Sequence, residues 1–163
     1  NERIQAGSIT ITALHVPGHT PSCTAYLIDN NLFSGDAIFQ PTLGCGRADF
    51  PGGSATSLFH SIKDHIFSLP DDTIIWVGHD YPERPEGAQA STSVQNEKQH
   101  NRMITAATTL EEFVHNRESK DRTLGPPKLL LPSLQVNILG GQLPHADHDG
   151  RVMLRIPISA KKS

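Results

Sequence analysis

The sequence of 163 residues lacks the features that mark several protein classes. It has only two cysteines, Cys23 and Cys45, which excludes a disulfide framework and favours a reducing compartment. No apolar run reaches the roughly 18 residues of a membrane span, and no signal peptide is visible. A net charge of −3 offers no basic face for nucleic acid. We therefore expect a cytoplasmic protein, or a mitochondrial matrix protein if the source is eukaryotic, without membrane or nucleic-acid partners.

What the chain does contain is turn-forming sequence. With 12 prolines and 13 glycines, it should be globular but rich in loops, and its length suits one domain. The chain opens with Asn1-Glu2-Arg3 and no Met. We interpret residues 1–163 as the C-terminal portion of one domain, with a core over 1–105 and a C-terminal helix and extended tail over 106–163.

The first half alternates short strands with turns. Period-two alternation predicts strands, and the Leu58, Ile62, Ile66 spacing predicts a helix that Pro70 ends. The expected elements are a strand over 8–14, a hairpin over 26–34 that turns at 29–31, a long loop over 40–53, a helix over 54–68 and a strand over 73–77. This order predicts an α/β (α+β) fold, with a mixed sheet and helices packed outside it.

The second half is less regular. The expected elements are a polar loop over 82–87, a helix beginning at 91–93 and reaching 101, a helix over 109–117, an extended segment over 132–141 and an edge strand over 153–158. Thr109 and Glu112 are spaced as a capping box, which fixes the start of one of these helices.

Three short motifs each place a possible metal ligand at the end of an apolar run. They are His15–Thr20, Ser34–Asp36 and Val77–Tyr81, and a glycine stands just before His19, Asp36 and His79. Each glycine lets the backbone turn so that the next side chain reaches a shared cleft. Imidazole and carboxylate are ligands that Fe(II) and Zn(II) sites share. The recurrence of the pattern indicates a metalloenzyme.

The order of these motifs resembles the later metal motifs of the metallo-β-lactamase fold, an αββα sandwich. Gly44–Phe50, the helix with Leu58–Ile62, His79-Asp80-Tyr81 and the stretch 128–144 look like the persulfide dioxygenase (sulfur dioxygenase) branch. The resemblance covers nearly the whole chain. It departs at Ala48, where Thr is common, and the His-x-His-x-Asp-His motif that precedes these motifs in the family is not in this sequence.

The resemblance implies a mononuclear non-haem iron site. His19 and Asp36 match the second His and the Asp of the iron triad, while the first His belongs to the absent motif. His79 is conditional, because it matches a ligand of the second metal in dinuclear hydrolases of the fold. The reaction implied is oxidation of glutathione persulfide, or a related persulfide, to sulfite by O2. Partners implied are this thiol or persulfide substrate and the protein's own N-terminal half, with a homodimer left open.

The resemblance also suggests roles around the metal. Arg47 is the candidate for binding a glutathione carboxylate, because guanidinium groups recognise carboxylates through two hydrogen bonds. The alternative for Arg47 is a structural salt bridge with Asp49. Asp80 and Tyr81 are candidate catalytic residues that hydrogen-bond to ligands or substrate, and Tyr81 could instead be a packed residue beside a loop.

Other possible ligands and nucleophiles have simpler explanations. Cys45 between two glycines could be a reactive thiol, but a buried or loop thiol is preferred. His60 and His65 are five positions apart on a predicted helix, a poor spacing for shared coordination. The run His145–Asp149 lies in a polar, Gly-flanked tail and is interpreted as a surface loop.

Three functional hypotheses remain open at this point. The first is the iron-dependent persulfide dioxygenase, and the second is a dinuclear zinc hydrolase of the same fold, such as a glyoxalase II-like thioesterase. The third is a non-catalytic fragment or binding module. The last predicts no stoichiometric metal, together with an exposed apolar face where the other half of the sandwich would pack.

Overall fold

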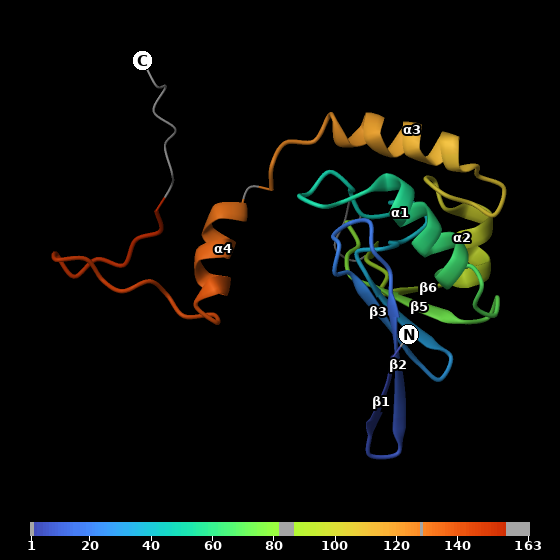
Figure 1. Ribbon diagram of the computed structural model, residues 1–163, viewed down its shortest axis with the longest axis horizontal. Coiled ribbons are helices and arrows are strands. Elements are labelled where there is room, and N and C mark those ends of the chain that lie inside the picture. The colour runs from blue at the N-terminus through green and yellow to red at the C-terminus, as the bar shows by residue number, and fades with distance from the viewer. Residues whose placement is uncertain (1, 82–86, 128, 156–163) are drawn as a thin grey trace. The chain divides into compact units, whose positions relative to one another are not determined.

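The structure is a computed structural model that describes residues 2–81, 87–127 and 129–155 (Figure 1). These residues form two compact units, Asn1–Thr123 and Leu124–Ser163. The helix predicted near residue 109 therefore belongs with the sheet in the first unit. Among the described residues, no helix is long and apolar enough to cross a membrane.

A six-stranded sheet organises the first unit, and its strands follow chain order from edge to edge. They are β1 Glu2–Ala6, β2 Ile9–His15, β3 Thr24–Ile28, β4 Asn31–Gly35, β5 Ile74–Val77 and β6 Ser91–Ser93. All neighbouring strands pair antiparallel except β4 and β5, which are parallel. As a result β2, β4 and β5 run in one direction, and their carboxyl ends lie at the same end of the sheet.

The predicted hairpin is confirmed, and its turn explains its register. Tyr26 pairs with Phe33 and Ile28 with Asn31, which leaves Asp29 and Asn30 as a two-residue turn. Asp29 has φ 49°, a conformation that Asp and Asn tolerate better than most residues. The mixed sheet with helices outside it is confirmed as well.

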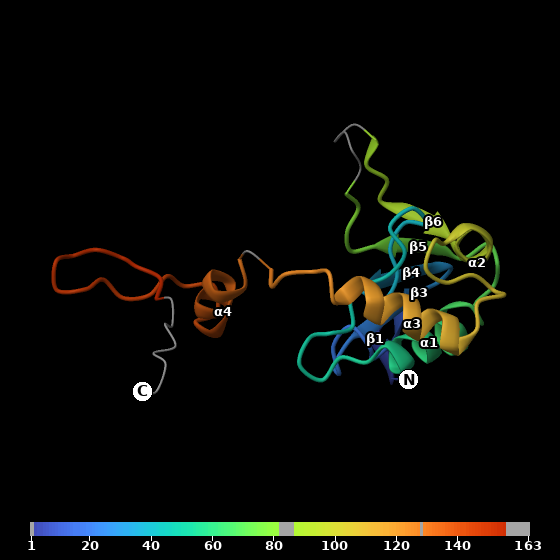
Figure 2. The ribbon, with the colours of Figure 1, turned by 90° about the horizontal axis from the view of Figure 1, so that it is seen from above.

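The helices of the first unit lie against one face of its sheet (Figures 1 and 2). Ser54 caps α1 (Ala55–His60) by accepting a hydrogen bond from the amide of Ser57, at 3.2 Å. The predicted helix then continues as a π-helical segment, η1 (Ser61–Ile66), in which the Phe67 amide bonds to the Ile62 carbonyl at 2.8 Å. A π-helical turn inserts one residue, so the spacing of side chains differs from the α-helix that the sequence predicts.

Two further helices complete the first unit. The helix expected to start at residues 91–93 begins instead at α2 (Val94–His100), capped by Ser93, because Ser91–Ser93 pair with β5 as an edge strand. The capping box of Thr109 and Glu112 is confirmed at the start of α3 (Leu110–Asp121), which runs four residues beyond the predicted end at 117.

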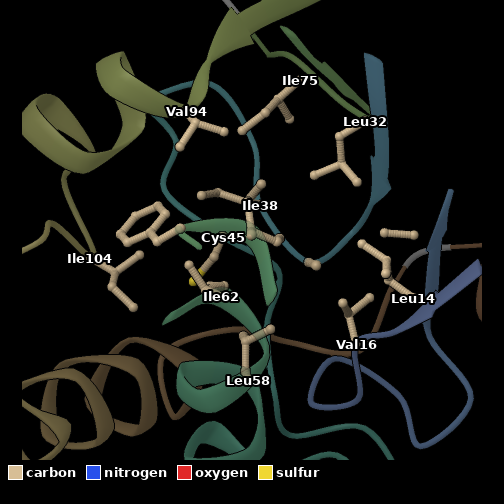
Figure 3. Close-up of a cluster of buried hydrophobic side chains, with 14 of the residues drawn as sticks. Leu14, Val16, Leu32, Ile38, Cys45, Leu58, Ile62, Ile75, Val94 and Ile104 are labelled. Carbon is tan, nitrogen blue, oxygen red and sulfur yellow. The ribbon is translucent and has the colours of Figure 1, made fainter. Parts of the chain in front are cut away.

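The hydrophobic core lies between the sheet and these helices (Figure 3). Leu14, Leu32 and Ile75 point from the sheet toward Leu58 and Ile62 of the first helix, and all five are at most 5% exposed. Burial of each such side chain stabilises the fold by about 1.5–3 kcal/mol. The core therefore fixes the helix that begins beside the candidate ligand His19.

The opposite face of the sheet is apolar but exposed. The strand register places Tyr26, Phe33 and Trp76 in one row, in which Phe33 and Trp76 stack at 6.4 Å. Each of these three side chains is 38–43% exposed, as expected for a sheet face that packs against a second layer in an αββα sandwich.

A long loop follows β4, as predicted, and a buried ion pair holds it against α3. Arg117, 1% exposed, binds both carboxylate oxygens of Asp121 at 2.6 and 3.2 Å and the Cys45 carbonyl at 3.1 Å. The same carboxylate accepts a hydrogen bond from the Ala48 amide at 2.9 Å. Since every polar group of this pair has partners, the loop over residues 45–48 is anchored at both ends.

A second buried carboxyl lies on α2. Glu97 is fully buried and accepts a 2.6 Å hydrogen bond from the side-chain amide of Asn101. Burial raises the pKa of its carboxyl to about 7, although the hydrogen bond from Asn101 opposes the rise. Its Oε1 is a buried oxygen without a partner within the described residues. A buried, partly unsatisfied carboxyl is costly when it carries charge.

The second unit corrects two sequence predictions. Residues 132–141 are not extended, because Leu130–Ile138 form α4. Pro132 occupies the first helical turn, where its missing N–H would have had no partner within the helix. Residues 153–155 are not in a strand, and the rest of the predicted edge strand, like 82–86 of the predicted polar loop, lies outside the described residues.

Loss of the buried cation in Arg117→Met should destabilise the fold by about 3–5 kcal/mol, because Asp121 keeps an uncompensated buried charge. Arg122→Met is the matched control, since Arg122 is exposed and lies 3.8 Å from Glu118, and it should change stability by at most about 1 kcal/mol. Denaturant unfolding of both variants beside the parent measures this. Equal effects would mean that the pair does not anchor the loop.

Glu97 should make stability depend on pH. Its folded pKa of about 7 exceeds the ordinary glutamate pKa of 4.5, so the folded state holds the proton and stability falls as pH rises from 4.5 through 7. The Glu97→Gln variant should lack this fall. The unfolding free energy of the variant minus that of the parent should therefore increase by about 3 kcal/mol between about pH 4 and pH 8. Unfolding free energies at a series of pH values provide the test, and a constant difference would contradict it.

Candidate metal centre

The three candidate ligands lie where β2, β4 and β5 end. Gly18, with φ 145°, turns the chain after β2, and a Cβ there would lie 2.4 Å from Leu58 of α1. The two serines that flank α1 also hold this turn, because the Ser54 amide donates to the Gly18 carbonyl at 2.8 Å and the Ser61 hydroxyl to the Pro17 carbonyl at 2.7 Å. The turn and the helix together set the position of His19.

Asp36 brings the two histidines together. Its Oδ2 lies 3.3 Å from His19 Nε2, and its Oδ1 lies 3.4 Å from His79 Nε2. The side chain of His19 is 14% exposed, that of Asp36 29% and that of His79 49%. The predicted cluster is therefore one site, open to solvent on the side of His79.

The tautomer of His19 follows from its second nitrogen. Nδ1 lies 2.7 Å from the Arg47 carbonyl oxygen, which can only accept, so Nδ1 carries the hydrogen. In the neutral ring Nε2 then presents a lone pair to the Asp36 carboxylate, which is also an acceptor. Two acceptors at this distance need a cation between them, either a proton on Nε2 or a metal ion. A metal ion meets this requirement, because histidine ligands commonly donate their other N–H to a backbone carbonyl.

This donor set fits a divalent iron or zinc ion. Nε2 of His19 and a carboxylate oxygen of Asp36 converge, and both ions accept imidazole and carboxylate ligands. Phe50 packs edge-on against His19 at 5.0 Å, which limits rotation of the ring. The assignment of the two residues as metal ligands stays a prediction that this geometry supports.

His79 is held by aromatic contacts. It lies edge-on to Phe39 at 5.9 Å and stacks on Tyr81 at 5.5 Å with an interplanar angle of 21°. A Cβ on Gly78 would lie only 3.0 Å from Asp36 Oδ1, so the close approach of these two motifs favours glycine. His79 can reach a second metal, or it can remain a neighbour of a single one.

The structure places the remaining predicted site residues around this cluster. Arg47 binds both oxygens of Asp49 at 2.6 and 2.7 Å, and the ion pair raises the pKa of the guanidinium and lowers the pKa of the carboxyl. Its guanidinium also lies 5.0 Å from the Phe50 ring centre. The salt bridge considered as an alternative is present, and binding of a substrate carboxylate by Arg47 stays a prediction.

Asp80 and Tyr81 follow His79 and face different neighbours. Asp80 accepts a hydrogen bond from the Gln89 amide at 2.8 Å, whereas Tyr81 is 68% exposed beside the His79 ring. Both line a cavity of about 660 Å³ whose walls include Arg102. The position of Tyr81 suits contact with a substrate, while the catalytic roles predicted for the two residues remain untested.

The other candidates do not join the site. Burial raises the pKa of the Cys45 thiol to about 11, so the thiol is a core group, as Figure 3 shows. Among the described residues, Asp147, His148 and Asp149 form the one group of at least three ligand atoms that all lie within 4.8 Å of one another. Asp147 there accepts hydrogen bonds from the Asp149 and Arg151 amides, which is a turn in an exposed loop.

Sequence reasoning missed the groups that orient the ligands. The Arg47 carbonyl is a backbone group, so residue identity alone gives no sign of its role. Gly46 was a usable signal, because a Cβ there would lie 2.2 Å from the Asp36 carbonyl and 3.1 Å from His19 Nδ1. A glycine at this close approach lets the loop pass directly behind both ligands.

Comparison with known proteins identifies the fold. Residues 5–79 match the Metallo-beta-lactamase superfamily. Glyoxylase B2 of Dictyostelium discoideum is 40% identical over 163 residues, covering 99% of this chain and 56% of that protein. The human mitochondrial persulfide dioxygenase ETHE1 is 37% identical over 115 residues, covering 69% of this chain and 42% of that protein.

A solved structure agrees with these sequence matches. ETHE1 from Myxococcus xanthus superposes with a TM-score of 0.75 at 35% identity, covering 86% of this chain and 58% of that one. The chain spans about half the length of these relatives. The predicted fold and the predicted resemblance to persulfide dioxygenases are confirmed. The sequence matches, the mixed sheet and the superposition together show that the chain has the metallo-β-lactamase fold.

Proposed function

We propose that the protein containing this chain is a persulfide dioxygenase with one Fe(II), for which the chain supplies the ligands His19 and Asp36. The observation that carries the proposal is the His19 ring, fixed by the Arg47 carbonyl with its Nε2 lone pair directed at Asp36. The similarity to two proteins named ETHE1, one of them a persulfide dioxygenase, favours persulfide oxidation over the other activities of the superfamily. The proposal concerns the whole protein.

The third protein ligand is proposed to be a histidine of the His-x-His-x-Asp-His motif, which this sequence does not contain. When bound, Fe(II) supplies the redox chemistry by which O2 oxidises the terminal sulfur of the persulfide. The balanced reaction is RSSH + O2 + H2O to RSH, sulfite and two protons. The S–S bond breaks, the terminal sulfur gains three oxygens, and the remaining sulfur leaves as the thiol.

The residues of this chain would orient the reactants. Asp36 and His19 would hold the metal, and the more exposed side near His79 would be open to the substrate. Tyr81, exposed and stacked on His79, lies where it can contact the thiol tail. Arg47 would bind a carboxylate of that tail only by sharing or releasing Asp49.

A second candidate is a dinuclear zinc hydrolase of the same superfamily. The observation that favours it is that the two oxygens of Asp36 face two different imidazoles, as a carboxylate shared by two metals would. The similarity to Glyoxylase B2 points the same way. The two candidates differ in metal count and in substrate, so one set of measurements separates them.

Anaerobic loading of the whole protein should give about one iron per chain, with sulfite formed and O2 consumed when glutathione persulfide is added. Asp36→Asn should lower iron affinity and sulfite formation at least about tenfold, because the amide is a poorer ligand than the carboxylate. His60→Ala, an exposed helix histidine, is the control and should behave as the parent. Two zinc ions per chain with thioester cleavage would exclude the dioxygenase.

Replacement of His79 tests the number of metals directly. With one iron, His79→Ala should leave the metal content near one per chain and weaken iron binding by less than Asp36→Asn does. In a two-metal site the same variant should lose about one of two ions. Metal analysis of the purified variant, after removal of excess ion, distinguishes these results, and a halved content would contradict the mononuclear site.

A further inference from the structure

Asn101, at the end of α2, uses its whole side-chain amide in a buried network. Nδ2 donates to the Gly44 carbonyl at 2.9 Å and to Glu97 Oε2 at 2.6 Å. Oδ1 accepts from the backbone amides of Met103 and Ile104 at 2.9 and 3.1 Å. Because both sides of the amide are engaged, the side chain has a single orientation.

The carbonyl that Asn101 holds belongs to the loop behind the metal centre. Two residues farther along, the Gly46 amide donates to the Asp36 carbonyl at 3.1 Å, and the Arg47 carbonyl accepts from His19. The missing side chain of Gly46 lets this loop lie against both predicted ligands. A displacement of the loop at Gly44 would therefore reach the backbone of Asp36 and the ring of His19.

Glu97 sets the direction of the Asn101 amide. Its carboxyl is fully buried, and Oε1 has no hydrogen-bond partner among the residues that the structure describes. A buried oxygen without a partner costs about 1–3 kcal/mol, and Gln or Leu at this position would avoid the charge. Burial raises the pKa of this carboxyl and the hydrogen bond from Asn101 opposes the rise, so the two groups are coupled.

We propose that Asn101, oriented by Glu97, is a positioning residue of the metal centre, which sets the Gly44–Arg47 loop and through it the geometry of His19 and Asp36. This inference rests on the proposed role of those two residues as metal ligands. Neither Asn101 nor Glu97 would touch the metal or the substrate. Their contribution is to keep the Arg47 carbonyl and the Asp36 backbone at a fixed separation.

The alternative is that Asn101 only stabilises the fold. Exchanging the amide and the carboxyl between positions 101 and 97 distinguishes this role from positioning of the metal centre. Asn101→Asp replaces the donor by an acceptor that faces Glu97 and the Gly44 carbonyl. Adding Glu97→Gln restores a donor between residues 97 and 101, but it leaves the Gly44 carbonyl without its side-chain donor. The double variant therefore repairs the helix contact and not the contact to the loop.

The experiment measures ferrous iron affinity, by anaerobic competition with a chromophoric chelator, and unfolding of the metal-free whole protein. We expect Asn101→Asp to lower both stability and iron affinity. The double variant should regain stability, yet bind iron at least about tenfold more weakly than the parent. Asn116→Asp, at an exposed position of α3, is the matched control and should match the parent in both measurements.

Recovery of iron affinity together with stability, or parent-like affinity in Asn101→Asp, would overturn the proposal. If the double variant stays unstable, Ile66→Val, a fully buried position in η1, supplies a core-destabilised comparison outside the two helices that anchor the loop. When it is compared at equal stability with this core variant, Asn101→Asp must bind iron more weakly. Equal iron affinities of the two variants would also overturn the proposal. His19→Ala in the parent tests the ligand assignment separately from the positioning by Asn101. Unchanged iron affinity in this variant would reject the assignment of His19 as a ligand.

Discussion

The hydrogen bond from His19 Nδ1 to the Arg47 carbonyl is the interaction on which the account of the site depends. At 2.7 Å it fixes the tautomer of the ring, and it leaves the Nε2 lone pair facing the Asp36 carboxylate. The acceptor is a backbone group in a loop, so its position depends on everything that holds the loop. The Arg117–Asp121 pair anchors residues 45–48 from one helix, and Asn101 anchors Gly44 from another.

Much of the fold and the ligand set could be predicted from the sequence because local patterns determine them. The turn signal at residues 29–31 identified the hairpin of β3 and β4, and the Thr109–Glu112 spacing identified the start of α3. The ligands could be grouped because each follows a strand and a glycine. The parallel pairing of β4 with β5 brings Asp36 and His79 to the same end of the sheet, as the shared sequence context suggested.

The rest could not be predicted because it depends on tertiary contacts. Ser91–Ser93 form a strand only because β5 offers an edge to pair with, and the proline in α4 is tolerated because it falls in the first turn. The π-helical segment η1 inserts a residue that no spacing rule anticipates. Likewise, the contact of Asn101 with Gly44 joins segments 57 positions apart.

The most direct test of the central claim is the protonation of the His19 ring. Long-range ¹⁵N–¹H NMR of the whole protein, labelled in histidine and assigned with a His19→Gln variant, reports which nitrogen carries hydrogen. The account predicts a protonated Nδ1 and an unprotonated Nε2 whose resonance moves when diamagnetic Zn(II) is added. A ring protonated at Nε2 alone, or an Nε2 resonance that Zn(II) leaves unchanged, would contradict it.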